Sequence, residues 1–153
     1  MSTYTARITW KSDSPETFTK NRYTRGHEWK FDGGVTVPAS SSPQVVPRFS
    51  VEAAVDPEEA LVASAASCHM LTFLWLAANA GFNIESYEDN AEGLMATTDA
   101  GKQWISTITL DPQIVWTGDK IPTAEELAAL HHEAHEVCYI ANSIKSEVVV
   151  KGI

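Results

Sequence analysis

Two cysteines are the residues of this sequence most able to do chemistry. Cys68 lies beside His69 in SAASCHMLTFLWL (64–76), and Cys138 lies seventy positions further on in HEVCYIANS (135–143). A single free cysteine is most often a small buried apolar residue, so packing is one interpretation. The other interpretations are a metal site, a structural disulfide and a redox-active pair of thiols.

The metal interpretation rests on spacing. His131, His135 and Cys138 stand at positions i, i+4 and i+7, so a helix would place them on one face, and Cys68 could supply a fourth ligand. Against it, the sequence has no CxxC or HExxH motif, and His131 and His132 could belong to a solvated helix face. Metal or ligand binding by a dimer without redox turnover is therefore kept as the alternative function.

Length and charge limit the class of protein. The 153 residues fit one domain, 1–153, and 44% hydrophobic with 20% charged residues is ordinary for a soluble globular protein. The net charge of -9 argues against a nucleic-acid or anionic-membrane partner, because such binding needs clustered lysine and arginine.

The N-terminal segment MSTYTARITWKSD has no apolar stretch after a basic start, so we expect a cytoplasmic protein without a secretory signal. In a reducing compartment two cysteines favour catalysis, redox cycling or packing over a permanent disulfide. Residues 60–80 are long enough to suggest a membrane span. We reject a span because the segment is rich in alanine and contains polar residues, namely Ser64, Ser67, His69, Thr72 and Asn79.

Hydrophobic alternation predicts strands at the N-terminus. YTARITW (4–10) and RYTRGHEWKF (22–31) alternate, the turn signal FDGG (31–34) follows, and VTVP (35–38) is expected to return as a hairpin. The next segment, ASSSPQVVPR (39–48), is rich in serine and proline, which predicts a loop that is mobile or carries function.

A long helix is predicted next. Asp56 is the expected N-cap, Pro57 the first helical residue, Glu59 the capping-box partner and Gly81 the stop. The segment of about 24 residues would be roughly 36 Å long and is apolar on nearly every face. Such a helix belongs at the centre of the protein or of a dimer.

The remaining pattern predicts strands, a second helix and a last strand. Residues 83–98 and 103–116 are expected to form a meander, with Ile105 on the face opposite Ile108 and Leu110. Thr123 and Glu126 form a capping box for a helix that runs to about Cys138, and SEVVVKGI (146–153) closes the chain. The order of elements predicts an α+β fold with mostly antiparallel strands.

AVDPEEALVASAASCHMLTFLWLAANAGF (54–82), followed by HEVCYIANSI (135–144), resembles the OsmC/Ohr superfamily of osmotically induced and organic hydroperoxide resistance proteins. The resemblance extends from about residue 4 to 150. It implies an intertwined α+β homodimer, with two long central helices between sheets and active sites at the subunit interface.

The resemblance also implies roles for residues. Cys68 matches the peroxidatic cysteine, Cys138 the resolving cysteine, and Glu58 the glutamate that holds a catalytic arginine. Arg25 is the best match for that arginine, with Arg22 and Arg48 as alternatives. Tyr139 follows Cys138 where many relatives have proline.

These roles make chemical sense. A guanidinium beside the Cys68 sulfur would favour the thiolate and polarise the peroxide. Attack gives a sulfenic acid, which condenses with Cys138 to a disulfide that an external dithiol, such as a lipoyl protein, reduces. No cofactor is expected. An apolar wall of Leu71, Phe73 and Trp75 would favour organic hydroperoxides, whose identity the sequence leaves open, as it does the reductant.

One geometric problem remains. On a straight helix Glu58 and Cys68 would be about 15 Å apart and roughly 80° out of phase, too far to share one arginine. We therefore expect a helix break near Ser64–Ser67, or an arginine that approaches from another strand or from the partner subunit. Glu58 could instead be only a favourable charge in the first helical turn.

The same helix predicts the oligomeric state. Because it is apolar on all sides and one chain offers few elements to cover it, we expect a stable homodimer that does not dissociate before it unfolds.

Overall fold

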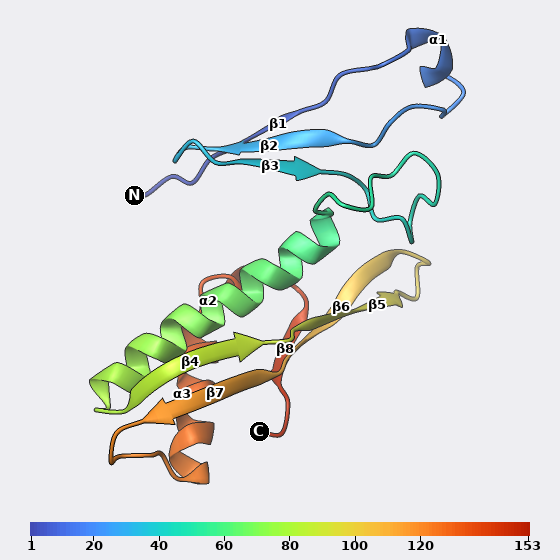
Figure 1. The fold of residues 1–153 in the computed structure, drawn as a ribbon. Coiled ribbons are helices and arrows are strands. Elements are labelled where there is room, and N and C mark those ends of the chain that lie inside the picture. The colour runs from blue at the N-terminus through green and yellow to red at the C-terminus, as the bar shows by residue number, and fades with distance from the viewer. The chain divides into compact units, whose positions relative to one another are not determined.

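The computed structural model describes residues 1–153, the side chain of Pro15 excepted. The chain divides into two compact units, Met1–Ala60 and Leu61–Ile153. The elements, drawn in Figure 1, are β1 (Ala6–Thr9), α1 (Pro15–Phe18), β2 (His27–Phe31), β3 (Thr36–Ala39), α2 (Pro57–Asn79), β4 (Asn83–Asp89), β5 (Glu92–Thr97), β6 (Gln103–Leu110), β7 (Pro112–Thr117), α3 (Ala124–Val137), the 3-10 turn η1 (Ala141–Ser143) and β8 (Glu147–Val150).

Helices are combined with mainly antiparallel strands, which confirms the predicted α+β class. The pair β6–β8 is parallel, and every other ladder between named strands in the described chain is antiparallel. The boundary between the two units falls inside α2. The assignment of residues 1–153 to one domain stays a prediction.

In the N-terminal unit, β1, β2 and β3 form a sheet in that order. The predicted hairpin is confirmed: Gly34 has a φ of +86°, which glycine tolerates, and Phe31 N donates to Val35 O across the turn. β2 begins at His27, so the prediction that Arg25 lies within this strand was wrong. The reason is that Arg25 N donates to Phe49 O of the following loop and not to a neighbouring strand.

That Ser/Pro loop is held by its own serine hydroxyls. Ser50 Oγ donates to Val46 O at 2.7 Å and lies 2.7 Å from Ser41 Oγ. Ser40 is fully buried, and its Oγ accepts from Val51 N. These side-chain hydrogen bonds add to backbone ones in the same segment, such as those from Ser40 N to Val55 O and from Val46 N to Ser42 O.

The C-terminal unit contains one long antiparallel ribbon. β4 pairs with β7 and β5 pairs with β6, so the two pairs follow each other along the same ribbon. Where the pairs meet, Asp89 Oδ1 accepts from Asp111 N at 2.8 Å. The predicted pairing of residues 83–98 with 103–116 as successive strands is confirmed, but each segment is divided into two strands, which alternation alone did not indicate.

A β-bulge in β6 changes which side chains face the core. Leu94 pairs with Thr107 and Met95 with Ile105, so Ser106 is an extra residue without a partner. Beyond the bulge the alternation changes phase. Ile105 and Ile108 are consequently buried in the same cluster, although they were predicted to lie on opposite faces.

α2 begins and ends as predicted. Glu59 N donates to Asp56 Oδ1 and Asp56 N donates to Glu59 Oε2, which is the expected capping box. At the other end Gly81 has a φ of +80°, and Phe82 N donates to Ala77 O, a hydrogen bond that closes the last turn.

The predicted break within α2 does not occur. The helix is continuous from Pro57 to Asn79. Ser64 Oγ donates to Leu61 O and Thr72 Oγ1 donates to Cys68 O, so these hydroxyls bond to carbonyls of the preceding turn and leave the helix intact.

Two hydrophobic clusters hold the C-terminal unit together, and α2 contributes to both. The first joins α2 to α3, with the β4–β7 pair packed against it; its buried members are Phe73, Leu76, Ala77, Phe82, Leu130 and Ala134. The second joins α2 to β6 and β8; its buried members are Ala65, Ile105, Ile108, Leu110 and Val148. Figure 1 shows α2 running along β4.

By length and composition alone α2 could cross a membrane, a test that the core helix of a soluble protein also passes. One side of α2 is buried against protein through Ala65, His69, Phe73, Leu76 and Ala77. A cytoplasmic location stays a prediction.

Candidate active site

The two cysteines lie in contact. Their Sγ atoms are 2.7 Å apart, and both cysteines are free. Cys68 is half-buried on α2, whereas Cys138 is 1% exposed at the C-terminus of α3. The two sulfurs are close enough to form a disulfide, whose S–S bond of about 2.05 Å would need only a small approach.

The end of α3 positions Cys138. The predicted capping box is confirmed at the start of α3, where Thr123 Oγ1 accepts from Glu126 N, and Cys138 is the C-cap. Beyond it, Asn142 donates to Cys138 O through both its backbone N and its Nδ2, and Ala141 N donates to Cys138 Sγ at 3.4 Å. Both the backbone and the sulfur of Cys138 are thereby held in place.

Tyr139 does not disturb this geometry. It is 79% exposed, and Cys138 has φ -67° and ψ 114°. A residue that precedes proline favours the same extended conformation. Tyrosine and proline are therefore compatible with one backbone at this position.

The surroundings of Cys138 shift the pKa of its thiol. Burial, followed by the hydrogen bond to Cys68, raises the pKa of the Cys138 thiol. Cys138 therefore keeps its proton and donates it toward the Cys68 sulfur.

A pair of buried histidines lies beside the thiols in sequence. His69 Nε2 and His131 Nδ1 are 2.9 Å apart, and the two ring planes are parallel to within 6°. His131 also stacks on Phe73, with ring centroids 4.2 Å apart. Among the described residues, His69 Nδ1 is buried without a hydrogen-bond partner.

These histidines are neutral near pH 7. Burial, together with the neighbouring His131 and His135, lowers the pKa of His69 to about 4, and burial alone lowers that of His131 to about 4. A shared N–H···N bond is consistent with this, because one ring must donate and the other must accept. The sequence pointed to both residues but not to their pairing; the available signal was four-residue spacing, from His69 to Phe73 and from Leu127 to His131.

The structure does not support the alternative metal site. The described residues contain no group of three or more His, Cys, Asp or Glu side chains that could hold a metal ion. His131 is directed to His69, so it does not act as a ligand together with His135 and Cys138.

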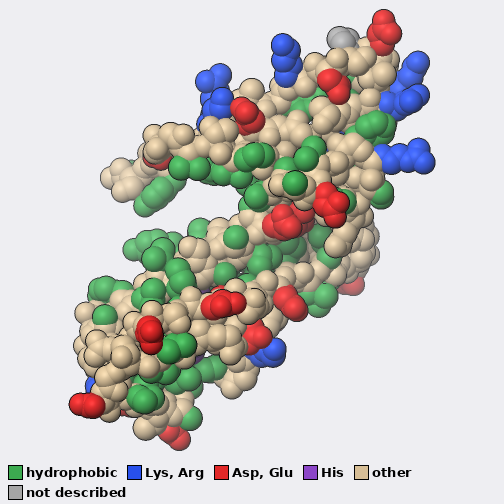
Figure 2. All heavy atoms as spheres, viewed as in Figure 1, with side chains coloured by type: hydrophobic (Ala, Val, Ile, Leu, Met, Phe, Trp, Pro, Cys, Tyr) green, Lys and Arg blue, Asp and Glu red, His purple; other side chains and the backbone are tan. Residues whose placement is uncertain are grey.

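The predicted arginine is engaged locally. Arg25 donates to Tyr23 O at 2.9 Å, and its guanidinium carbon lies 3.6 Å from the centre of the Tyr23 ring. Arg22 and Arg48 are exposed. The sequence has four arginines, all within the N-terminal unit, where Figure 2 also shows Lys and Arg side chains gathered.

Glu58 lies half-buried in the first turn of α2. Among the described residues it takes part in no ion pair with Arg25; the two salt bridges present are Lys30–Glu28 and Lys151–Asp111. The roles of Glu58 and Arg25 stay predictions.

A family model described as "OsmC-like protein" matches residues 50–151. The chain belongs to the OsmC-like family. The matched region contains Glu58, Cys68 and Cys138 and begins after Arg48, the last arginine of the sequence. The resemblance inferred from the sequence is thus confirmed.

Solved structures agree with this membership. An OsmC-like protein of unknown function from Vibrio cholerae is 50% identical, with a TM-score of 0.95 and 99% coverage of both chains. An organic hydroperoxide resistance protein from Elizabethkingia anophelis is 17% identical, with a TM-score of 0.70 and coverage of 98% of this chain and 96% of that one. The organic hydroperoxide resistance protein OsmC from Legionella pneumophila is 20% identical, with a TM-score of 0.65 and coverage of 99% and 95%. The last two likenesses show the fold alone, and no curated protein matches the chain.

Proposed function

We propose that this OsmC-like protein is a thiol-dependent peroxidase that reduces organic hydroperoxides. The observation that carries the proposal is the 2.7 Å contact between Cys68 Sγ and Cys138 Sγ. Membership of the OsmC-like family and two structural neighbours named organic hydroperoxide resistance proteins support it.

The reaction has two chemical steps on the protein. The Cys68 thiolate attacks a peroxide oxygen, the O–O bond breaks, and the alkoxide takes a proton and leaves as an alcohol, so Cys68 becomes a sulfenic acid. The Cys138 thiol then attacks the Cys68 sulfur, and its proton leaves with the hydroxyl group as water. Two electrons have passed from the thiols to the peroxide, and an external dithiol returns them through thiol–disulfide exchange.

The protonated state of Cys138 fits this order of events. A raised pKa keeps Cys138 as a thiol while Cys68 reacts, so the buried sulfur does not compete for the peroxide. The half-buried Cys68 is the sulfur that a substrate can approach. Cys68 is therefore the peroxidatic residue of the proposal, and Cys138 is the resolving residue.

An arginine completes the proposed site. We assign it as Arg25, held by Glu58, with Arg22 and Arg48 as the other candidates. Its guanidinium would stabilise the thiolate and polarise the peroxide through charge-assisted hydrogen bonds. Because α2 is continuous, the Glu58 carboxylate and the Cys68 sulfur stay far apart on one helix.

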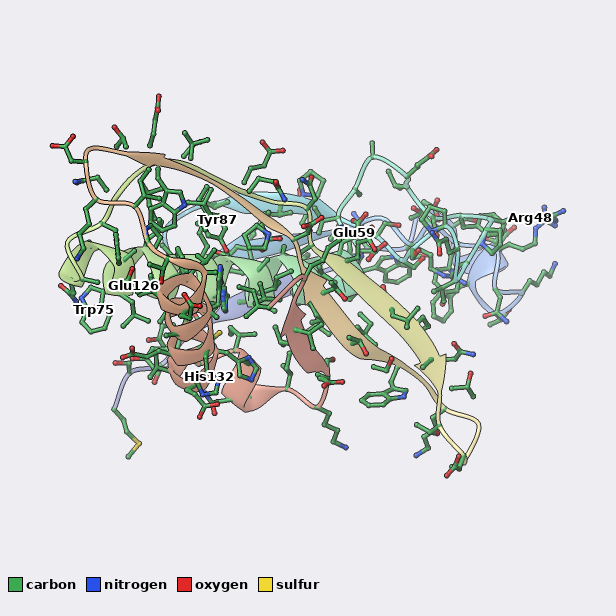
Figure 3. All side chains as sticks on the ribbon, turned by 90° about the horizontal axis from the view of Figure 1, so that it is seen from below. Arg48, Glu59, Trp75, Tyr87, Glu126 and His132 are labelled. Carbon is green, nitrogen blue, oxygen red and sulfur yellow. The ribbon has the colours of Figure 1, made fainter. Side chains whose placement is uncertain are left out.

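One of the three apolar residues predicted to line the substrate site, Phe73, is wrongly placed. Phe73 is fully buried in the core and cannot line a substrate site. Leu71 and Trp75 are 62% and 63% exposed and lie four positions apart on one face of α2. Figure 3 shows Trp75 projecting outward from α2.

This exposed apolar face supports the proposed homodimer. Leu71 and Trp75 would lie in water in a single chain, whereas a second copy of α2 would bury them at a gain of about 25 cal/mol per Å². Active sites built from both chains are part of this proposal, with the arginine supplied by the N-terminal unit of the partner chain.

Peroxide consumption tests the proposal. The wild-type protein is given cumene hydroperoxide or hydrogen peroxide with dithiothreitol, dihydrolipoamide or glutathione as the reductant. Faster turnover of the organic peroxide with a dithiol supports the proposal. Absence of turnover with every reductant, together with unchanged thiols, would refute it.

A further inference from the structure

The contact between His69 and His131 has no part in the chemistry above, yet it joins the two helices that carry the thiols. His69 follows Cys68 directly on α2, and His131 lies seven residues, or two helical turns, before Cys138 on α3. His69 and His131 are 1% and 3% exposed. α2 and α3 therefore meet through two side-chain contacts of defined geometry, one between imidazoles and one between thiols.

Around these two contacts, His131 stacks on Phe73 and apolar side chains pack together. Phe73, Leu76 and Ala77 of α2 share a cluster with Leu130 and Ala134 of α3. Apolar contacts are less directional than a hydrogen bond, so this packing alone fixes the position of α3 along α2 less sharply. A buried hydrogen bond fixes that position more sharply, because displacement leaves two buried ring nitrogens unpaired.

We propose that His69 and His131 are positioning residues for disulfide formation, whose hydrogen bond fixes α3 against α2 so that Cys138 stays in contact with Cys68. The inference deepens the proposed function, on which its catalytic meaning rests. Neither histidine touches the peroxide. Their hydrogen bond raises the rate of the second step, in which Cys138 attacks the Cys68 sulfenic acid. It also stabilises the disulfide relative to the dithiol.

The atoms of the contact define a sharp set of variants. The bond uses Nδ1 of His131, and an asparagine places an amide atom at that δ position. Glutamine places its amide one bond further out, and leucine removes the polar group. His131→Asn should therefore keep the contact, whereas His131→Gln and His131→Leu should lose it. His132→Leu is the control, because His132 is the next residue of α3, is exposed, and lies on the outer side of the helix in Figure 3.

Two measurements separate positioning from general damage. The first is the rate at which cumene hydroperoxide oxidises Cys68, compared with the rate at which the sulfenic acid, trapped with dimedone, converts to the disulfide. The second is the equilibrium between the Cys68–Cys138 dithiol and disulfide in buffers of reduced and oxidised dithiothreitol. The second needs no peroxide, so the failure of the proposed function and the failure of this inference give different results.

We expect His131→Leu and His131→Gln to slow disulfide formation about tenfold and to shift the equilibrium toward the dithiol by a similar factor. Oxidation of Cys68 should be unchanged, and His131→Asn and His132→Leu should match the wild type. If His131→Leu does not fold, the test rests on the rates of disulfide formation and the disulfide equilibria of His131→Asn and His131→Gln. Equal disulfide equilibria in these two variants, or an equal loss of both steps, would overturn the inference.

Discussion

The sulfur atoms of Cys68 and Cys138 lie 2.7 Å apart although seventy positions of sequence separate the residues. The contact arises because α2 and α3 share a hydrophobic cluster, and because Cys138 lies at the point where α3 ends and its backbone turns extended. A helix-terminal cysteine can approach a neighbouring helix without breaking the hydrogen bonds of its own.

The first prediction separates the roles of the two cysteines. Cys68→Ser should abolish peroxide consumption, because serine gives no sulfenic acid. Cys138→Ser should leave one rapid oxidation of Cys68 and a long-lived sulfenic acid that dimedone traps. Mass spectrometry of the trapped protein checks this. Trapping at position 138 in Cys68→Ser would reverse the assignment.

The second prediction concerns the arginine. Arg25→Ala should slow oxidation and alkylation of Cys68 about tenfold to a hundredfold, because a charge-assisted hydrogen bond is worth about 1.5–3 kcal/mol. Arg7→Ala is the control, since Arg7 lies exposed on β1 of the same unit. Alkylation rates of Cys68 measured across pH provide the test. A loss seen in Arg22→Ala or Arg48→Ala, and not in Arg25→Ala, would move the assignment to that residue.

The sequence predicted the ends of the helices better than the pairing of the strands. Asp56, Glu59, Thr123 and Glu126 act within one helical turn, so local sequence determines the caps. The antiparallel pairing of residues 83–98 with 103–116 was predicted, but the bulge at Ser106 and the parallel pairing of β6 with β8 were not, because alternation alone does not encode them.

The same distinction applies to the site. The types and contexts of Cys68 and Cys138 were sufficient to pair them through a family resemblance. The partner of His131 could not be predicted in this way, because four-residue spacing along a helix fits a metal ligand and a buried hydrogen-bonded ring equally well. Contact with His69 is a tertiary property, and it removes His131 from the metal site that the spacing had suggested.

The third prediction concerns stability in acid. Burial holds the pKa of His69 and His131 at about 4, below the usual 6.5, so the unfolded chain takes up protons before the folded one does. The free energy of unfolding therefore keeps its full contribution from the neutral histidines above about pH 6.5. It falls between pH 6.5 and 4, by about 1.4 kcal/mol per histidine for each unit of pKa difference.

Urea midpoints at pH 7, 6 and 5 measure this loss. The double variant His69→Gln/His131→Asn should show a shallower dependence on pH than the wild type, whereas His132→Asn should keep the wild-type slope. Asp89, whose pKa burial raises, acts in the opposite direction but is common to all the variants. Equal slopes in the wild type and the double variant would contradict the prediction.

The fourth prediction tests the dimer. Leu71 and Ile121 are both 62% exposed, but only Leu71 lies on α2. Leu71→Glu should weaken the dimer, because it places a charge in the proposed interface, and Ile121→Glu should leave it intact. Sedimentation at micromolar and lower concentrations measures the difference. A folded, active monomer of the wild type at 16.7 kDa would exclude an obligate dimer.

The central claim is that Cys68 and Cys138 act together as a two-electron reductant of hydroperoxides. The most direct measurement is a count of free thiols in the fully reduced protein before and after one equivalent of cumene hydroperoxide without reductant, with peptide mapping of the product. Both thiols of each chain should be lost, and a Cys68–Cys138 disulfide and one equivalent of cumyl alcohol should be formed. Two free thiols that remain alongside unconsumed peroxide would contradict it.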